Sequence, residues 1–478
     1  MKKEIIVNRA LEETRVAVLE DGKLFDLFIE RRETEKILNN IYKGVVQNIV
    51  PALSSAFIDL GFGKSAYLGV GDVISKNKTE GNNNVSSLLK TRQEIMVQVY
   101  KEPISTKGPK VTMDISLPGR LLVYMPYSDN IGISRNVDDK KESDRLKSIA
   151  VKLKKDISGG LIIRTEAEDA TEEEIAREIR YLSRLWRSIL DRFKTAKPQT
   201  LIHKDLGVVF QTVRDYFSDN VELMHIDSQK ELKDVMDFMK IISPEFTDRI
   251  ALYDGDRPIF DVYGIEDELK HLLANKIKLK SGGYLIIQEA ESLCAIDVNS
   301  GKFTSKNSQE DTAALTNIEA AEEVARQLRL RNIGGIIVID FIDMKKASNR
   351  QKVLEKLRSF TRGDKAKIKI WPITKLGLVE MTRERKRESL LALMGETCPL
   401  CNGVGQVVSR ESIFTKVCCE IDKMNINIHR GIARIKLNPA MYEYFLERKG
   451  RLKELFNIDF EIKTDLDLER EDYKIILE

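Results

Sequence analysis

The stretches LCAIDVNSG (293–301) and IIVIDFIDM (336–344) decide the fold of the central part of this chain. Each contains a short apolar run that reaches an aspartate, as a buried strand does where it arrives at the edge of a sheet. The segment between them, DTAALTNIEAAEEVARQLRLRN (311–332), has the periodicity of an amphipathic helix. A strand–helix–strand crossover within one sheet makes its two strands parallel. The sequence therefore predicts that Asp297 and Asp340 converge on one edge of a sheet.

This pair of aspartates has the chemistry of a metal site. Converging carboxylates repel each other unless a cation lies between them. Mg²⁺ prefers oxygen ligands and often uses one or two carboxylates with water and substrate phosphate, so we expect Asp297 and Asp340 to hold Mg²⁺. Asn299 shares a strand face with Asp297 if the strand extends that far, and its amide could then orient a carboxylate. Either aspartate alone would read as a solvated strand end, whereas the pair favours a site.

The remaining segments indicate several domains of mixed structure. Short strands with glycines at the bends, between residues 37 and 118, predict a small barrel. The alternation that continues after the aspartate pair predicts an α/β layer with parallel strands. Helices are predicted over 138–155, 171–193 and 349–361, and strands over GVVF (207–210), VELMHI (221–226), RIALYD (249–254) and IKIWPIT (368–374). Residues 408–478 alternate between helix and strand signals and predict a small α+β unit.

Composition limits the classes of protein to which the chain can belong. With 478 residues it is long enough for two to four domains. A net charge of only +3 excludes a polycation, so any nucleic-acid binding must come from local basic patches. The sequence has no run of 18 apolar residues, which predicts no membrane span. Its N-terminus lacks the apolar run of a signal peptide, and its five cysteines fit a reducing cytoplasm. We therefore expect a cytoplasmic protein.

The stretch ETCPLCNGVG (396–405) resembles half of a zinc site. Structural zinc is almost always four-coordinate, and Cys398 and Cys401 supply two thiolates. Cys418 and Cys419 could complete the set, but apolar residues at helical spacing place them on a helix, where neighbouring side chains point about 100° apart. A redox role for the CxxC is a further alternative. A second copy of the chain is the most economical source of two more thiolates, which predicts a zinc-linked homodimer.

Four stretches closely resemble the ribonuclease E/G family in sequence, order and spacing. They are AIDVNSG (295–301), TNIEAAEEVARQLRLRNIGGIIVIDFIDM (316–344), GLVEMTRER (377–385) and CPLC (398–401). The resemblance begins at NIYKGVVQNIVPALSSAFIDLG (40–61), covers most of the chain and weakens after about residue 410. The chain is more similar to the short members of this family than to those with a long proline- or arginine-rich tail.

The resemblance implies an α+β multidomain fold. It implies a ribonuclease H-like subdomain (1–36 and 206–272) with an inserted S1-type OB barrel (37–118) and 5′-sensor region (119–205), a DNase I-like α/β catalytic subdomain (273–394), a zinc-link (395–407) and a small α+β C-terminal domain (408–478). In this family the CPxC motif is shared between protomers, which agrees with a homodimer linked by Zn²⁺ through Cys398 and Cys401. Whether such dimers pair into tetramers is left open by the sequence.

The resemblance also implies an activity, namely Mg²⁺-dependent endonucleolytic cleavage of single-stranded RNA. Asp297 and Asp340 match the catalytic aspartates of the family, and Asn299 matches its supporting asparagine. The implied mechanism is attack by a metal-activated water, which leaves 5′-phosphate and 3′-hydroxyl ends. The substrates implied are precursors of rRNA and decaying mRNA, with a preference for 5′-monophosphorylated ends. Two rival readings are a non-catalytic RNA-binding or chaperone protein and a nuclease that acts on DNA.

Residues that would contact RNA are implied in three places. Phe57 and Tyr67 match base-stacking positions of the S1-type module, the alternative being that both belong to the barrel core. Lys107 matches a lysine that contacts RNA. The pocket for a 5′-monophosphate is implied at Arg164, Thr165, Gly119 and Val123, where a guanidinium would offer two parallel donors to phosphate. The basic segments KIKLKSGG (276–283) and TRERKRES (382–389) flank the aspartates and are either solvated or in contact with phosphates.

Overall fold

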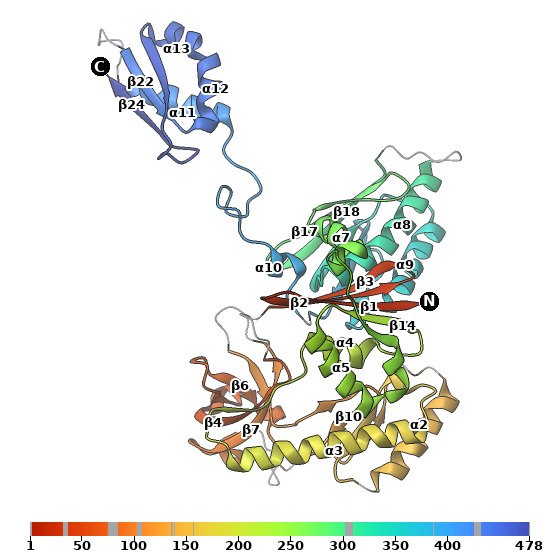
Figure 1. Cartoon of the computed structure of the whole chain (residues 1–478). Coiled ribbons are helices and arrows are strands. Elements are labelled where there is room, and N and C mark those ends of the chain that lie inside the picture. Colours follow the sequence, from red (N-terminus) through yellow and green to blue (C-terminus); the bar gives the residue numbers. More distant parts are fainter. Residues whose placement is uncertain are drawn as a thin grey trace. The chain divides into compact units, whose positions relative to one another are not determined.

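The chain divides into two compact units, residues 1–390 and residues 391–478 (Figure 1). The computed structural model describes residues 2–31, 37–74, 85–102, 108–134, 137, 139–155, 157–301, 309–385, 387–424 and 432–477. Lys107, one of the predicted RNA contacts, lies outside these residues. Within them, no helix is long and apolar enough to cross a membrane.

The first sheet of the large unit joins the N-terminal strands to strands that come much later in the chain. Its order is β15-β14-β1-β2-β3, with β1 pairing parallel to β14 and antiparallel to β2. The strands are β1 (Lys3–Arg9), β2 (Glu13–Glu20), β3 (Lys23–Arg31), β14 (Val221–Ile226) and β15 (Ile250–Leu252). The helices near them in the chain are α4 (Val208–Tyr216), α5 (Gln229–Ile242), α6 (Ile259–Val262) and α7 (Ile265–Leu272). Apolar residues of α4 and α5 form one core with this sheet.

Between β3 and α4 the chain forms a closed five-stranded barrel, as the glycine-punctuated strands predict. The strand order β4-β5-β6-β8-β7 closes because β4 also pairs with β7. The strands are β4 (Ile41–Val50), β5 (Ser55–Asp59), β6 (Ala66–Gly69), β7 (Glu94–Lys101) and β8 (Lys110–Thr112), with β13 (Thr200–His203) added on the outer side of β4 and the short helix α1 (Val85–Leu88) preceding β7.

A four-stranded sheet with two long helices follows the barrel. Its order is β11-β12-β10-β9, formed by β9 (Leu117–Pro118), β10 (Leu122–Met125), β11 (Ile131–Ile133) and β12 (Gly160–Ile163). The helices are α2 (Lys140–Lys154) and α3 (Glu172–Thr195), close to the predicted ranges. A capping box fixes the start of α3, because Thr171 and Glu174 satisfy each other's backbone N–H groups. Residues from both helices share one core with the sheet.

The last sheet of the large unit carries the aspartate pair. Its order is β16-β17-β18-β19-β21-β20. The strands are β16 (Lys276–Lys278), β17 (Tyr284–Glu289), β18 (Leu293–Asn299), β19 (Gly335–Asp340), β20 (Ile368–Ile370) and β21 (Leu378–Arg383), and the helices are α8 (Gln309–Leu330) and α9 (Ala347–Thr361). Both helices pack against one face of this sheet (Figure 1). The opposite face is exposed, and we call it the open face.

One prediction about secondary structure is wrong. GVVF (207–210) begins helix α4 rather than forming a strand, because its short apolar run is the buried side of an amphipathic helix that continues to Tyr216. Strands β18, β19 and β20 are parallel, as the predicted α/β layer requires. β18 and β19 pair directly, and β20 runs parallel to β19 because both pair antiparallel with β21, which lies between them. Helix α9 therefore forms a second crossover.

The small unit, considered by itself, has its own core, as the alternation over 408–478 predicts. A three-stranded sheet of order β23-β22-β24 is formed by β22 (Ile432–Leu437), β23 (Asp459–Thr464) and β24 (Tyr473–Leu477). Helices α11 (Arg410–Lys423), α12 (Pro439–Glu447) and α13 (Lys449–Phe456) contribute to the same core. The short helix α10 (Leu390–Met394) lies at the junction between the two units.

Candidate active site and RNA-contacting regions

The two predicted catalytic aspartates lie side by side on the open face. Asp297 on β18 is in direct register with Asp340 on β19, and the helix that connects these strands is α8. Alternate residues of β18 are buried against the helices, as with Ile296, so Asp297 points the other way and is exposed, like Asp340. The predicted parallel crossover is confirmed by this register. Because neighbouring strands are roughly 4.8 Å apart, both carboxylates can reach one cation.

Asn299 ends the same strand on the same face. Its Nδ2 donates a hydrogen bond of 2.8 Å to Oδ2 of Asp297, which holds that carboxylate in one orientation. Among the described residues, no ion pair is recorded for Asp297 or Asp340. Two exposed carboxylates in register, one of them oriented by an amide, are a donor set that fits a hard divalent cation such as Mg²⁺.

The open face is basic at the edge formed by β16. The register places Asp297 opposite Ile286 of β17 and Ile286 opposite Lys276 of β16. Lys276 therefore lies in the same row as the aspartates, two strands or about 10 Å from Asp297. The next row pairs Lys278 with Tyr284, and the Lys276 Nζ lies 3.7 Å from the centre of the Tyr284 ring. The predicted basic segment 276–283 thus borders the acidic centre on one surface.

Arg164 lies directly after β12 and is held by three polar groups. Its Nη1 donates to the carbonyl oxygen of Gly119 at 2.7 Å and to Oδ1 of Asp215 at 2.9 Å, while its Nε lies 3.3 Å from Oε2 of Glu166. The guanidinium has five N–H donors. Among the described residues, no hydrogen bond or ion pair is recorded for its Nη2. Part of the guanidinium therefore remains able to bind an anion.

The other predicted pocket residues lie near Arg164. Thr165 follows it, and the Thr165 Oγ1 is 3.0 Å from Oγ of Ser134. Val123 on β10 pairs with Ile162, two residues before Arg164. The structure thus brings Gly119, Val123, Arg164 and Thr165 together at one end of the four-stranded sheet.

Sequence analysis missed the groups that fix the Gly119 turn. Glu178 of α3 is buried, and its carboxylate accepts hydrogen bonds from the backbone N–H groups of Arg120 and of Leu121, the latter at 2.7 Å. Burial raises the pKa of Glu178, against the lowering effect of those amides. A Cβ at position 119 would clash with Oε1 of Glu178, so this turn requires glycine. Glu178 could not be recognised from the sequence because it is one of several acids at the start of α3.

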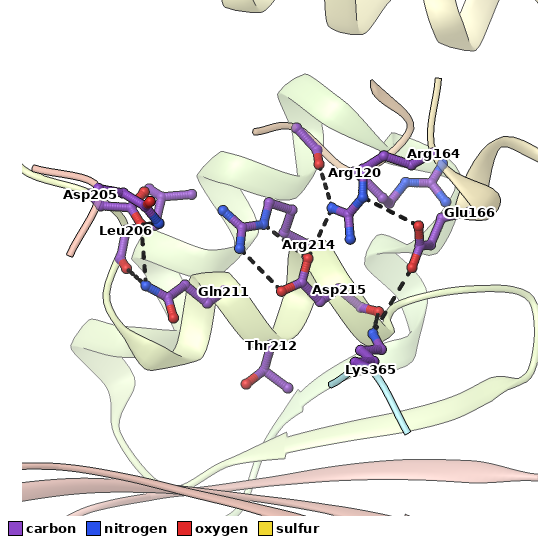
Figure 2. A network of polar contacts seen from close by, with 12 residues as sticks. Arg120, Arg164, Glu166, Asp205, Leu206, Gln211, Thr212, Arg214, Asp215 and Lys365 are labelled. Carbon is purple, nitrogen blue, oxygen red and sulfur yellow. Dashed lines mark hydrogen bonds and ion pairs between the residues drawn. The ribbon is translucent and has the colours of Figure 1, made fainter. Parts of the chain in front are cut away.

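A network of charges surrounds Arg164, and we call Arg164, Glu166, Arg214, Asp215 and Lys365 the Arg164 network (Figure 2). Arg214 donates from Nε and Nη2 to the two carboxylate oxygens of Asp215, at 3.0 and 3.1 Å. Burial acts to raise the pKa of Asp215, but the hydrogen bond and charge of Arg214, with Arg164 and Lys365, lower it to about 2. Asp215 is therefore a fixed negative charge beside Arg164.

Lys365 enters this network from the turn between α9 and β20. Its Nζ donates to the carbonyl oxygen of Asp215, lies 4.0 Å from Oε1 of Glu166 and is 3.6 Å from the centre of the Tyr216 ring. Burial lowers the pKa of Lys365 to about 8, although Asp215 and Glu166 act to raise it. No local pattern marks this residue, because its partners come from segments distant along the chain.

The predicted stacking residues lie on the outer side of the barrel. Phe57 and Tyr67 are paired across β5 and β6, with ring centroids 6.2 Å apart and an interplanar angle of 78°. Their neighbours Ala56 and Ile58 are in the barrel core, whereas both aromatic rings are half-buried. The Lys110 Nζ lies 5.4 Å from the centre of the Tyr67 ring. The two rings thus form an aromatic surface with a cation beside it.

The two predicted zinc ligands lie in a tight turn of the small unit. Asn402 N–H donates to the Cys398 carbonyl at 2.8 Å, and Val404 N–H donates to the Cys401 carbonyl at 2.9 Å. Cys398 is exposed and Cys401 is half-buried, and both thiols are free. The backbone amides of Gly405 and Gly403 lower the pKa of Cys401. Amides directed at a thiol favour the thiolate that Zn²⁺ binds, so this turn fits half of a zinc site.

Cys418 and Cys419 both lie on α11, as predicted, with Cys418 packed against the core of the small unit and Cys419 exposed. Among the described residues, no group of three or more His, Cys, Asp or Glu side chains could hold a metal ion.

Comparisons with known proteins identify the family. A sequence profile described as the Ribonuclease E/G family matches residues 116–386. The chain is 37% identical over 491 residues to Ribonuclease G of Haemophilus influenzae, with 99% of both chains covered. It is 38% identical over 439 residues to Ribonuclease G of Escherichia coli strain K12, covering 90% of this chain and 89% of that protein. The chain belongs to the ribonuclease E/G family.

Other matches are consistent with this family or carry no argument. Ribonuclease E of Nostoc sp. is 36% identical over 412 residues, which cover 85% of this chain and 59% of that protein. A solved structure, the intact alpha subunit of aIF2 from Pyrococcus abyssi, has a TM-score of 0.14 and 13% identity, too low to bear on the fold. As a member of the ribonuclease E/G family, the chain is an endoribonuclease, and its closed barrel is an OB-like, S1-type element.

Proposed function

We propose that this endoribonuclease cleaves single-stranded RNA in a Mg²⁺-dependent reaction at Asp297 and Asp340. The observation that carries the proposal is the register of these two exposed carboxylates on adjacent strands, with Asn299 orienting one of them at 2.8 Å. When bound, Mg²⁺ would lower the pKa of water and offset charge on the phosphate. Asp297 and Asp340 would hold the cation, and the products would carry 5′-phosphate and 3′-hydroxyl ends.

RNA would reach this site across the open face. Lys276 and Lys278 at its β16 edge are placed to contact phosphates on either side of the scissile bond. The paired rings of Phe57 and Tyr67 would stack on bases of the same strand without selecting a sequence. Lys107 stays a prediction. We infer that the RNAs cut are rRNA precursors and mRNAs in decay, in the cytoplasm.

We also propose that Arg164, Thr165, Gly119 and Val123 bind a 5′-monophosphate and so favour RNA with that end. The Nη2 of Arg164, for which no partner is recorded in the part of the chain that the structure describes, and the Thr165 hydroxyl offer donors to a phosphate. The parts of the large unit would then correspond to a ribonuclease H-like subdomain, the 5′-sensor region and a DNase I-like catalytic subdomain. The boundaries given above for these parts stay predictions.

A single cleavage assay tests the reaction. A 5′-monophosphorylated single-stranded RNA and a DNA of the same sequence are incubated with the full chain, with and without Mg²⁺. The proposal predicts cleavage only of RNA and only with Mg²⁺, with 3′-hydroxyl ends on the upstream product. Cleavage of both polymers, or cleavage in excess chelator, would contradict it.

The second proposed metal is Zn²⁺ bound by Cys398 and Cys401 of two protomers, which makes a homodimer. The exposed thiol of Cys398, the half-buried thiol of Cys401 and the glycine amides at Cys401 support this arrangement. Replacing Cys398 with serine should release zinc and shift the protein from dimer to monomer, as measured by light scattering with metal analysis. A dimer without zinc, or a monomer that retains one zinc per chain, would refute the shared site. The formation of tetramers from such dimers can be read from the same measurement.

A further inference from the structure

The carboxylate of Glu166 lies between two cations from different parts of the large unit. Its Oε2 is 3.3 Å from Nε of Arg164, and its Oε1 is 4.0 Å from Nζ of Lys365. Arg164 follows a strand of the four-stranded sheet, whereas Lys365 belongs to the turn before β20 of the sheet that carries the aspartates. Figure 2 shows Glu166 between these two side chains. One oxygen thus faces the proposed 5′-phosphate pocket and the other faces the catalytic sheet.

Lys365 is held in place from more than one side. Its ammonium contacts the carbonyl oxygen of Asp215 and lies over the ring of Tyr216, both at the end of α4. The side chain is 40% exposed, so it can adjust by a small rotation without unpacking. At 4.0 Å, its contact with Glu166 is loose and could shorten.

The turn that carries Lys365 is attached firmly to the strands of the active site. Its neighbour Asp364 forms a buried ion pair with Arg383 at 2.7 Å, with each side chain only 5% exposed. Arg383 ends β21 opposite Gly335 of β19, and the other end of β21 places Leu378 opposite Asp340. A force on Lys365 therefore acts on the strand next to one catalytic aspartate.

A bound 5′-phosphate would change the balance between the two cations. The phosphate would approach the Nη2 side of Arg164 and bring up to two negative charges close to Glu166. Like charges a few ångströms apart repel strongly when partly shielded from water. The Glu166 carboxylate would then lose its attraction to Arg164, while the ammonium of Lys365 still attracts it from the other side.

We propose that Glu166 is a switch residue, which moves from Arg164 to Lys365 when a 5′-phosphate occupies the pocket and so draws the turn at Lys365 towards the four-stranded sheet. This inference rests on the proposed 5′-monophosphate pocket and adds the route by which its occupancy reaches the active site. Glu166 and Lys365 are positioning residues in this scheme, because neither touches the reacting atoms.

The experiment measures kcat and KM for two RNAs of one sequence, with a 5′-monophosphate or a 5′-hydroxyl. Lys365→Met and Glu166→Gln should each lower the monophosphate-to-hydroxyl ratio of kcat by about tenfold. Their rates on the hydroxyl RNA should stay unchanged. The KM for the monophosphorylated RNA should stay unchanged in Lys365→Met, whereas Glu166→Gln removes a carboxylate that competes for Arg164 and should not raise it. Lys365→Arg keeps the charge and should retain the ratio. Lys356→Met is the matched control, because that lysine also lies near an aromatic ring, Phe360, but outside the Arg164 network.

The outcomes separate the switch from the pocket. If Arg164→Gln removes the preference while Lys365→Met and Glu166→Gln keep it in full, the switch is wrong and the pocket stands. If Arg164→Gln also keeps the preference, both the pocket and the switch are wrong. Equal losses on both RNAs in Lys365→Met and Glu166→Gln would assign these residues a merely structural role and overturn the switch.

Discussion

The two polar centres of the large unit differ in whether their charged side chains are paired. At the open face, Asp297 and Asp340 are adjacent, exposed and without a recorded cationic partner among the described residues. In the Arg164 network, the arginine is already paired with the carboxylates of Asp215 and Glu166. The first centre needs a ligand cation to offset its charge. The second has three cations and two carboxylates, and a phosphate must compete with both carboxylates for Arg164. We therefore expect the first centre to decide whether cleavage occurs and the second to adjust its rate.

The largest expected effect is the loss of cleavage in Asp340→Asn. Removing one metal-binding carboxylate takes away several kcal/mol of transition-state stabilisation, which corresponds to a rate loss of roughly a thousandfold or more. RNA binding, measured by fluorescence anisotropy, should fall little, because the basic edge and the barrel are unchanged. Asp343→Asn, an exposed acid in the loop after β19, is the control and should remain active. Mg²⁺-dependent cleavage by Asp340→Asn would contradict the proposed site.

The second expected effect is smaller and confined to one substrate. Arg164→Gln removes the guanidinium that would bind the phosphate, and it should lower the monophosphate-to-hydroxyl ratio of kcat/KM by roughly ten- to a hundredfold. Arg184→Gln, on the exposed side of α3, should leave the ratio unchanged. Equal losses on both RNAs would mean that Arg164 supports the fold of this region rather than reading the 5′ end.

The two centres also differ in how far the sequence predicts them. Asp297 and Asp340 were predicted together because their position depends on local rules, namely two apolar strands and one crossover helix. Asn299 followed from the two-residue period of a strand. The Arg164 network depends on contacts between segments that are distant along the chain. Asp215 lies on α4, whose first residues the sequence predicts as a strand, and Lys365 lies in a turn with no local signature.

The barrel is also only partly predictable from the sequence. Its closure was predicted from short strands and glycines, and β4, β5, β6, β7 and β8 form it. Which aromatic side chains face outward could not be decided without the register. Only the placement of Ala56 and Ile58 in the core puts Phe57 on the outer side, next to Tyr67. The periodicity of the sequence likewise does not predict that β21 lies between β19 and β20. An edge strand and an inner strand of this length have similar patterns of apolar residues.

A third prediction concerns pH and applies only to the Arg164 network. Burial lowers the pKa of Lys365 to about 8, so its charge is present below that pH and is lost above it. The charged and titratable groups that act on Lys365 are Asp215, Glu166, Arg164, Asp26 and Tyr216. Asp215, with a pKa of about 2, stays ionised throughout this range. The monophosphate-to-hydroxyl ratio of kcat should therefore fall between about pH 7 and pH 9.5. The fall should be several-fold and at most about tenfold.

Dividing the kcat for the monophosphorylated RNA by that for the hydroxyl RNA at each pH cancels the effect of pH on the metal and on water. The Lys365→Arg variant should keep the ratio across the same range, because arginine stays protonated. A ratio that falls equally in Lys365→Arg would place the titrating group elsewhere and remove Lys365 from the explanation.

The smallest expected effect is at the basic edge of the open face. If Lys276 contacts one phosphate, Lys276→Gln should weaken the binding of single-stranded RNA about fivefold at 0.1 M salt and make the slope of log K against log salt shallower by about 0.7. Lys276 lies in the same row as Asp297 and Asp340, so the loss should appear with every RNA, whatever its 5′ end. This independence from the 5′ end separates the open face from the Arg164 network.

Lys270→Gln is the matched control for charge. Lys270 is an exposed lysine of α7 that pairs with Asp267 at 2.9 Å, so its replacement changes the net charge equally without touching the open face. Equal shifts in slope for both variants would indicate only a general field effect. A shift for Lys276→Gln alone would place a phosphate at the β16 edge, about two strands from the aspartates, and would fix the direction in which RNA crosses the sheet.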